Sequence, residues 1–243
     1  MGSSIHGQKF VEEFGGYWPE YNLYTEEYIP GETLSQYLER NRSEIEENTA
    51  PDRWQMRWLH FIWSGTAAYI NFWWRSEKKV QIHKPSPKNV IIPEHDYASG
   101  TRLISITNRK DTSEISNVLF SIYKHYIDDT EKEYFGLKRM ADWELIFSVI
   151  MQETKVKYGI PLIKQFKDEI NNDSNKKNIA KNYGLTNKRI DDFLFEIEND
   201  GVLTKRMVFA ALRYERWLDL NQNATLKART AILQELYLSL IHI

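Results

Sequence analysis

Basic residues gather around a short polar loop in the first half of the sequence. Two of them, Lys84 and Lys88, lie inside the run His-Lys-Pro-Ser-Pro-Lys-Asn at residues 83–89. Ammonium and guanidinium groups at this density can bind a phosphate. A solvated run of charges gives the same pattern and is the commoner explanation, so both interpretations stay open. The whole cluster comprises Arg75, Lys78, Lys79, Lys84 and Lys88.

Residue types that support other kinds of catalysis form no usable pattern. The chain has no cysteine, which excludes disulfides, Cys-ligated zinc, iron–sulfur clusters and thiol nucleophiles. A Gly-x-Ser-x-Gly nucleophile elbow is also missing. Acidic and histidine side chains do not fall at metal-ligand spacings, so we predict no catalytic residue and no metal site. The side chains considered were His60, His83, His95, Asp96, His125, Asp128 and Asp129.

Composition predicts a globular chain rich in helices. The 243 residues are 42% hydrophobic and 27% charged, which excludes disordered, collagen-like and disulfide-framework chains. Only 11 glycines and 7 prolines are present, so tight turns are scarce and long elements are favoured. The net charge of −2 gives no overall attraction for nucleic acid or for an anionic membrane. Any binding of that kind must be local.

Hydrophobic periodicity predicts the elements before the loop. A strand at residues 21–29 runs into Pro30-Gly31, and a surface helix with a narrow buried stripe follows. A second helix after Pro51 is apolar on most sides. Its 17 most apolar residues, 58–74, are at the short limit for a membrane span and carry polar side chains in the middle, so we favour a buried helix. The surface helix buries Leu34, Tyr37, Leu38 and Ile45.

Short strands and further helices are predicted from the loop onward. Runs at residues 80–83, 90–92 and 103–107 are β-like, and the last two form a hairpin. Ser113 is expected to cap a helix whose buried face comprises Ile115, Val118, Leu119, Ile122 and Tyr126. Another helix is expected over residues 137–150, and a shorter one after Pro161. The chain is thus mainly α with a small β component, an α+β arrangement.

Three stretches near the loop occur in an uncommon order. Residues 26–34 read Glu-Glu-Tyr-Ile-Pro-Gly-Glu-Thr-Leu, residues 82–91 read Ile-His-Lys-Pro-Ser-Pro-Lys-Asn-Val-Ile, and residues 102–107 read Arg-Leu-Ile-Ser-Ile-Thr. They resemble the hinge, the catalytic loop and the metal-binding strand of the protein-kinase-like C-terminal lobe, in its aminoglycoside and choline kinase branch. The resemblance covers roughly residues 17–127. It implies a kinase-like C-terminal lobe followed by a helical region.

The resemblance also implies that phosphoryl transfer has been lost. This reaction needs a carboxylate at the acceptor hydroxyl, an amide at the metal and a second carboxylate that holds Mg²⁺. Asn89 matches the amide, but Lys84 and Ser105 stand where the carboxylates are expected. The chain therefore resembles a pseudokinase, for which no cofactor is required and to which ATP could bind without Mg²⁺. The implied nucleotide-binding residues are Glu27, Tyr28, Ile29, Lys84, Lys88, Asn89 and Ser105.

Two other interpretations of this region stay open. The chain could be an atypical nucleotide-dependent phosphotransferase, in which Lys84 or Lys88 binds phosphate and Glu94 or Asp96 holds the metal. It could also be an ordinary α+β scaffold in which the proline-rich loop is only a rigid turn, although the kinase-like interpretation is favoured.

The second half of the chain contains a helix-turn-helix-like pattern. Residues 179–190 read as a helix, a turn containing Gly184 and a second helix capped by Thr186. In a DNA-binding version, Asn187, Lys188 and Arg189 would enter the major groove. Acidic residues at 191 and 192 would face the phosphates, so a structural hairpin is favoured over a DNA-linked regulator.

Domain limits and partners follow from these patterns. We predict a kinase-like hinge and lobe at 1–130, its helical extension at 131–175 and a helical domain at 176–237, with the boundary in the polar run 171–177. Residues 238–243 match the translation of a transposon-derived adapter used for DNA libraries, so we expect an artefact there and a longer natural protein. Expected partners are proteins or another domain of that longer chain, in the cytoplasm, without a membrane.

Overall fold

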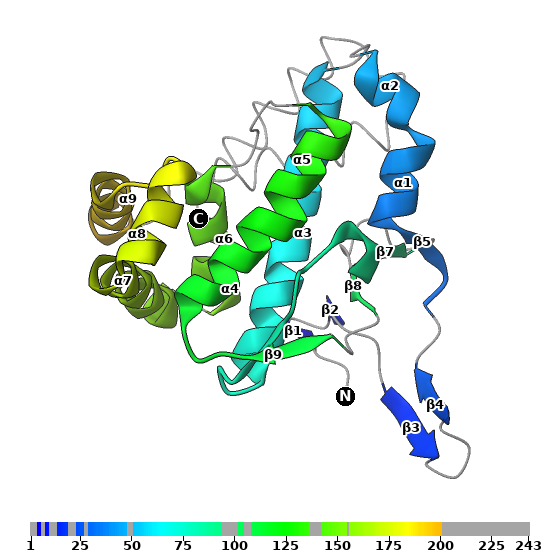
Figure 1. Cartoon of the computed structure of the whole chain (residues 1–243), viewed down its shortest axis with the longest axis horizontal. Coiled ribbons are helices and arrows are strands. Elements are labelled where there is room, and N and C mark those ends of the chain that lie inside the picture. Colours follow the sequence, from blue (N-terminus) through cyan, green and yellow to red (C-terminus); the bar gives the residue numbers. More distant parts are fainter. Residues whose placement is uncertain are drawn as a thin grey trace.

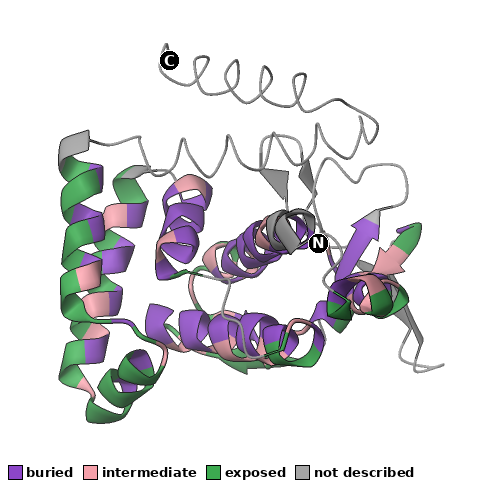
Figure 2. Ribbon diagram, turned by 90° about the horizontal axis from the view of Figure 1, so that it is seen from above, coloured by how far each residue is buried: buried purple, intermediate pink, exposed green. Residues whose placement is uncertain are grey.

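The computed structural model describes residues 29–47, 51–93, 102–104, 108–136, 142–154 and 156–200, together with four short strands before residue 29. Helices dominate, as expected for a chain that is mainly α with a small β component. They pack with their buried faces toward one another and their exposed faces outward (Figure 2). The helices are α1 (Leu34–Arg40), α2 (Arg42–Glu46), α3 (Pro51–Arg75), η2 (Pro87–Asn89), α4 (Ile115–Ser121), η4 (Ile122–Asp128), α5 (Asp129–Tyr134), α6 (Trp143–Glu153), α7 (Val156–Asn172), α8 (Ser174–Asn182) and α9 (Asn187–Asp200).

The strands are short and pair antiparallel in small sheets. The strand expected at residues 21–29 is β4, and the hairpin expected after the loop is confirmed by the pairing of β7 with β8. The sheets are β1–β2, β3–β4, β5–β7–β8 and β6–β9. The strands are β1 (Ser4–Ile5), β2 (Gln8–Lys9), β3 (Phe14–Trp18), β4 (Leu23–Glu26), β5 (Gly31–Thr33), β6 (Val80–Ile82), β7 (Val90–Pro93), β8 (Arg102–Leu103) and β9 (Arg109–Asp111).

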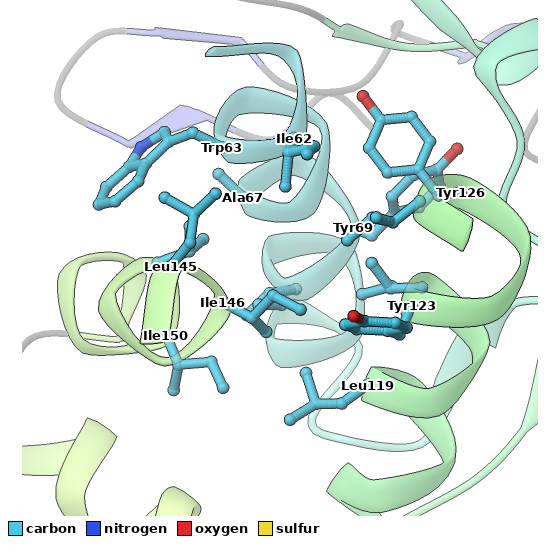
Figure 3. Packing of buried hydrophobic residues seen from close by; sticks show 14 of the residues in the cluster. Ile62, Trp63, Ala67, Tyr69, Leu119, Tyr123, Tyr126, Leu145, Ile146 and Ile150 are labelled. Carbon is cyan, nitrogen blue, oxygen red and sulfur yellow. The ribbon is translucent and has the colours of Figure 1, made fainter. Parts of the chain in front are cut away.

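Helix α3 is the central element of the fold. It runs through the middle of the molecule, between the continuous helix of α4, η4 and α5 on one side and α6 on the other (Figures 1 and 3). Its apolar side chains are buried on nearly every side, which confirms the buried helix predicted after Pro51. Within the described part of the chain, no helix combines the length and the apolar character that a membrane crossing requires.

The end of α3 aims the chain at the candidate loop. The Lys78 amide donates to the Trp73 carbonyl oxygen at 3.1 Å, which is the long hydrogen bond of a Schellman motif. Glu77 and Lys78 both adopt left-handed backbone conformations, with φ of 58° and 61°, although neither is glycine. The Ser76 hydroxyl closes the turn by accepting from the Val80 amide at 3.0 Å. The chain therefore reverses within four residues and enters β6.

A continuous helical run from α4 to α5 packs against α3. It buries the predicted face, which includes Ile115, Leu119 and Tyr126. Its middle, η4, is wound as a π-helix, an irregularity that the sequence pattern did not predict. The expected Ser113 cap is wrong: the N-cap residue is Glu114, without a side-chain cap, and Thr112 accepts its amide hydrogen at 3.3 Å.

The predicted start of α7 is also wrong. The sequence indicated a helix after Pro161, but α7 begins at Val156 and contains this proline. Close packing on α6 explains the earlier start, because a Cβ atom at Gly159 would lie 2.8 Å from the Cα of Met151. The packing of α7 on α6 thus offsets the helical hydrogen bond that is lost because Pro161 has no backbone N–H. The predicted helix over 137–150 is described from Trp143, and residues 137–141 lie outside the described part.

The predicted boundary at 171–177 falls between two packed helices. Helix α7 ends at Asn172 and α8 begins at Ser174, with Asp173 alone between them. The Asp173 carboxylate caps α8 by accepting from the Asn175 and Lys176 amides at 2.8 and 3.2 Å. Buried side chains from α1 to α9 belong to one hydrophobic cluster. The division into domains remains a prediction.

Candidate functional site

The loop at residues 83–89 has a fixed backbone, although most of it lies at the surface. Lys84 adopts a left-handed conformation with φ of 53°, which few non-glycine residues do. Ser86 is extended, as expected before a proline, and Pro87 opens the short helix η2. The Ser86 hydroxyl accepts from the Lys88 amide at 3.3 Å. The sequence Lys-Pro-Ser-Pro-Lys therefore holds its two lysines at set positions along the loop.

A buried tyrosine from α3 anchors this loop. The Tyr69 hydroxyl donates to the Ser86 carbonyl oxygen at 3.0 Å and accepts from the Ser86 amide at 3.1 Å. Burial raises the pKa of Tyr69 well above its ordinary value, and its backbone hydrogen bond to Ser86 opposes this shift. The hydroxyl consequently stays protonated at neutral pH and keeps its donor.

Strand segments clamp the loop at both ends. The His83 amide donates to the Asn108 carbonyl oxygen at 2.8 Å, and the Ile104 amide donates to the Asn89 carbonyl oxygen at 2.9 Å. The backbone amide of Asn89 donates to the Ser86 carbonyl oxygen at 2.9 Å. The chain just before residue 105 is thus joined to Asn89. Ser105, which was predicted to belong to this site, lies outside the described residues.

The side chains that this loop presents are two ammonium groups, an amide and the half-buried imidazole of His83. Lys84 and Lys88 are exposed, and Asn89 is half-buried. No aspartate or glutamate occurs between Ile82 and Pro93. Two ammonium groups and an amide can attract and hydrogen-bond phosphate oxygens, but they cannot take a proton from an acceptor hydroxyl. The loop can bind an anion and lacks a carboxylate base, and His83, which is half-buried, is its one side chain of another type that serves as a general base in enzymes.

The described residues do not fit a Mg²⁺ ion. Magnesium in proteins is held by carboxylate and carbonyl oxygens, and Asn89 is the only amide side chain of the loop. Across the part of the chain that the structure describes, no three His, Asp or Glu side chains come together as a metal site. The alternative metal ligands Glu94 and Asp96 lie outside the described residues.

Other members of the predicted basic cluster have partners of their own. Lys79 forms a 2.5 Å ion pair with Glu77, and Lys78 lies over the Trp74 ring at 4.7 Å. These contacts hold the side chains of Lys78 and Lys79 at the turn after α3. The two loop lysines, Lys84 and Lys88, are therefore the members of the cluster best placed to meet a ligand at this loop.

The predicted hinge is described only in part. Glu27 and Tyr28 lie outside the described residues, whereas Ile29 is buried. The following strand β5 pairs with β7, with Glu32 opposite Ile92. The hinge segment therefore leads into a strand that lies beside the strand leaving the loop.

The helix-turn-helix-like hairpin forms as predicted, but two of its DNA-binding candidates make contacts within the protein. Thr186 caps α9 by accepting the Arg189 amide hydrogen at 3.3 Å. The Arg189 guanidinium forms ion pairs with Asp142 and, at 3.6 Å, with Glu144. Asn187 donates to the Asn171 side chain at 2.8 Å, and Lys188 is exposed. Arg189 thus links α9 to the start of α6, which supports a structural role.

Sequence reasoning missed Tyr69 as a functional residue. It lies within residues 58–74, which were predicted only to form a buried helix. The signal available was its hydroxyl, because a buried tyrosine oxygen usually needs a hydrogen-bond partner. A groove of about 810 Å³ along α7 was also missed. Its lining carries four carboxylates against two lysines, so it suits a phosphate poorly; the carboxylates are those of Glu114, Asp168, Glu169 and Asp173.

No family model, curated protein or solved structure matches the chain.

Removal of the Tyr69 hydroxyl is expected to loosen the loop. In Tyr69→Phe, both Ser86 backbone groups lose a partner, so the free energy of unfolding should fall by about 1–2 kcal/mol. Hydrogen exchange at the Ser86 amide should become faster. Tyr126→Phe is the matched control, because it removes the 2.7 Å bond to the Phe61 carbonyl oxygen and does not touch the loop. Unchanged exchange at Ser86 in Tyr69→Phe would show that the anchor is not needed.

Proposed function

We propose that this chain is a non-catalytic, kinase-like binding module that holds a nucleotide at the loop of residues 83–89 without transferring its phosphate. One observation carries the proposal: Lys84 and Lys88 are exposed on a loop that Tyr69 fixes from beneath and that carries no carboxylate. A preorganised loop with two cations favours binding of an anion, because little conformational entropy is lost when the anion binds.

The strand pairing supports the kinase-like part of the proposal. The hinge resemblance ends in β5, the loop lies between β6 and β7, and the third resembling stretch contains β8. Strands β5, β7 and β8 form one sheet, and β6 pairs with β9. The three stretches that carry the resemblance are therefore neighbours, as one nucleotide site formed by a hinge and a loop would require.

The loss of chemistry follows from the residues at the loop. A lysine at position 84 attracts phosphate but cannot act as the base that the resemblance would place there. Without a second carboxylate for Mg²⁺, the charge that develops on the γ-phosphate in the transition state has no metal to neutralise it. The same loop can still contribute to ligand binding, which suits a regulatory role within a longer protein.

Charge reversal at Lys84 tests the proposed binding. We expect Lys84→Glu to weaken ATP binding by about tenfold or more, because it replaces attraction for the phosphates by repulsion. Lys177→Glu is the matched control, since Lys177 is exposed on α8 and the charge change is the same. Isothermal titration with ATP measures both variants. Equal affinities for Lys84→Glu and the wild type would remove the loop from the site.

A transfer assay tests the absence of catalysis separately. Purified protein incubated with γ-labelled ATP, Mg²⁺ and a panel of hydroxyl acceptors should yield no labelled product above the background. Transfer that disappears in Asn89→Ala would contradict the non-catalytic proposal and would favour the atypical phosphotransferase instead.

A further inference from the structure

Ser86 is the one serine or threonine of the sequence that directly precedes a proline. It is the middle residue of Lys-Pro-Ser-Pro-Lys at 84–88, so a lysine stands two residues away on each side. Its backbone is extended, with φ of −146° and ψ of 150°, as expected before Pro87. An enzyme that modifies a serine followed by a proline therefore has a single acceptor of this type in the sequence.

The hydroxyl of Ser86 is not engaged as a donor. It accepts from the Lys88 amide at 3.3 Å, and it donates to no partner within the part of the chain that the structure describes. Tyr69 contacts the backbone amide and carbonyl oxygen of Ser86 and leaves its side chain alone. Ser86 itself is half-buried on a surface loop. The hydroxyl can therefore react while the backbone of the loop stays fixed.

A phosphate on Ser86 would lie within reach of both loop lysines. Two residues of chain span at most about 7 Å, and a lysine carries its ammonium group on a flexible four-carbon stem. Lys84 and Lys88 are exposed. No aspartate or glutamate between Ile82 and Pro93 would repel the new charge.

Carboxylates on the elements that contact η2 already have partners. Strand β5 and helix α1 both lie against η2. Glu32 of β5 pairs with Arg40 at 2.6 Å, and Glu39 of α1 pairs with Arg42 at 2.7 Å. These acidic groups are neutralised by arginines of their own, so the loop keeps the positive charge of its two lysines.

We propose that Ser86 is a phosphorylation site for a separate protein kinase, and that its phosphate then occupies the place between Lys84 and Lys88. The Ser86 oxygen attacks the γ-phosphorus of ATP bound to that kinase, the bond from this phosphorus to the bridging oxygen breaks, and ADP leaves. The serine proton passes to the kinase's own base. Phosphoserine carries nearly two negative charges at pH 7, which balance the two lysines.

Phosphorylation of this serine would switch off the loop as an anion site. With both lysines bound to the phosphate of Ser86, the loop no longer attracts the phosphates of ATP. This regulatory effect rests on the proposed nucleotide binding, whereas the modification and its contact with the lysines do not.

Labelling tests whether Ser86 is an acceptor. The full chain is incubated with a proline-directed protein kinase and γ-labelled ATP, and the labelled position is found by mass spectrometry. We expect one phosphate per chain, on Ser86, and none in Ser86→Ala. Ser174→Ala is the matched control, because Ser174 is exposed but does not precede a proline. A folded wild type that takes up no phosphate at Ser86 would overturn the proposal.

Phosphorus NMR tests the contact with the lysines. In the full chain with phosphoserine incorporated at position 86, the second pKa of the phosphate should fall from its ordinary value of about 6 to about 5.5, because two ammonium groups stabilise the dianion. Lys84→Gln with Lys88→Gln should return it to about 6. Lys177→Gln with Lys181→Gln removes two exposed lysines of α8 instead and should leave it low. An ordinary phosphate pKa in the presence of both loop lysines would contradict the proposed contact.

Calorimetric titration with ATP tests the regulation. The phosphorylated chain should bind ATP at least tenfold more weakly than the unmodified chain, and Ser86→Ala should bind like the unmodified chain. Equal affinities of the phosphorylated and unmodified chains would overturn the regulatory role. An unmodified chain that does not bind ATP would contradict the proposed function instead, and the labelling and the phosphate pKa would then decide on the modification site alone.

Discussion

Replacement of Trp143 by alanine is expected to lower the free energy of unfolding by roughly 3 to 5 kcal/mol, the range for large aromatic side chains in a core. Trp143 is fully buried and stacks on Tyr123, with ring centroids 4.5 Å apart and planes 10° apart. It also contacts Phe147 and Phe166, and its indole donates to the Tyr183 carbonyl oxygen at 3.2 Å. The indole thus joins η4, α6, α7 and the turn after α8.

A milder variant separates packing from hydrogen bonding at this position. Trp143→Phe keeps a ring on Tyr123 but removes the indole donor, so its loss should be about a third to a half of that of alanine. Chemical denaturation of both variants gives the comparison. A loss below about 1 kcal/mol for Trp143→Ala would contradict the central position of this side chain in the packing.

Gly65→Ala is expected to destabilise the fold by about 3 kcal/mol, although alanine normally favours a helix. A Cβ atom at Gly65 would lie 2.1 Å from the Tyr126 hydroxyl oxygen and 2.4 Å from the ring carbon that bears it. Tyr126 cannot retreat easily, because it is fully buried, donates to the Phe61 carbonyl oxygen and packs edge-on against Tyr69 at 5.4 Å (Figure 3). Glycine is required here by the close approach of the π-helical segment.

A double-mutant cycle tests that reason directly. In the Tyr126→Leu background, Gly65→Ala should no longer destabilise and should instead stabilise by up to about 1 kcal/mol, the helix preference of alanine over glycine. Thermal and urea unfolding of the four proteins measure the cycle. Equal destabilisation in both backgrounds would mean that Tyr126 is not what excludes a side chain at position 65.

Local patterns predicted most of the fold correctly. The apolar helix α3, the buried face of the helix that begins at Ile115 and the hairpin of β7 and β8 follow from spacing alone, because each element buries one set of side chains. The cap at Thr186 and the turn at Gly184 could also be predicted from the sequence, since hydroxyl caps and left-handed glycines have local causes.

Features that depend on distant partners could not be predicted. Helix α7 begins before Pro161 because it packs on α6, and η4 widens where Tyr126 meets α3. Arg189 looked available for DNA until Asp142, which lies 47 residues away in sequence, was seen to pair with it. Sequence patterns carry little information about such contacts.

The candidate site also has a part that the sequence predicts and a part that depends on distant contacts. The loop that carries Lys84, Lys88 and Asn89 could be found from residue types, whereas the anchor at Tyr69 required the fold. Tyr69 and Ser86 are 17 residues apart in sequence. In the sequence, Tyr69 has the helical spacing of an ordinary core residue. The predicted hinge and Ser105 stay predictions, since Glu27, Tyr28 and Ser105 lie outside the described residues.

The most direct test of the account is a calorimetric titration of ATP into the purified protein with excess EDTA, repeated with Mg²⁺. A loop that binds phosphate through Lys84 and Lys88 and has no carboxylate for a metal predicts saturable binding in EDTA, with no gain when Mg²⁺ is added. Absence of binding in EDTA, or affinity that appears only with Mg²⁺, would contradict the proposed metal-independent, non-catalytic site.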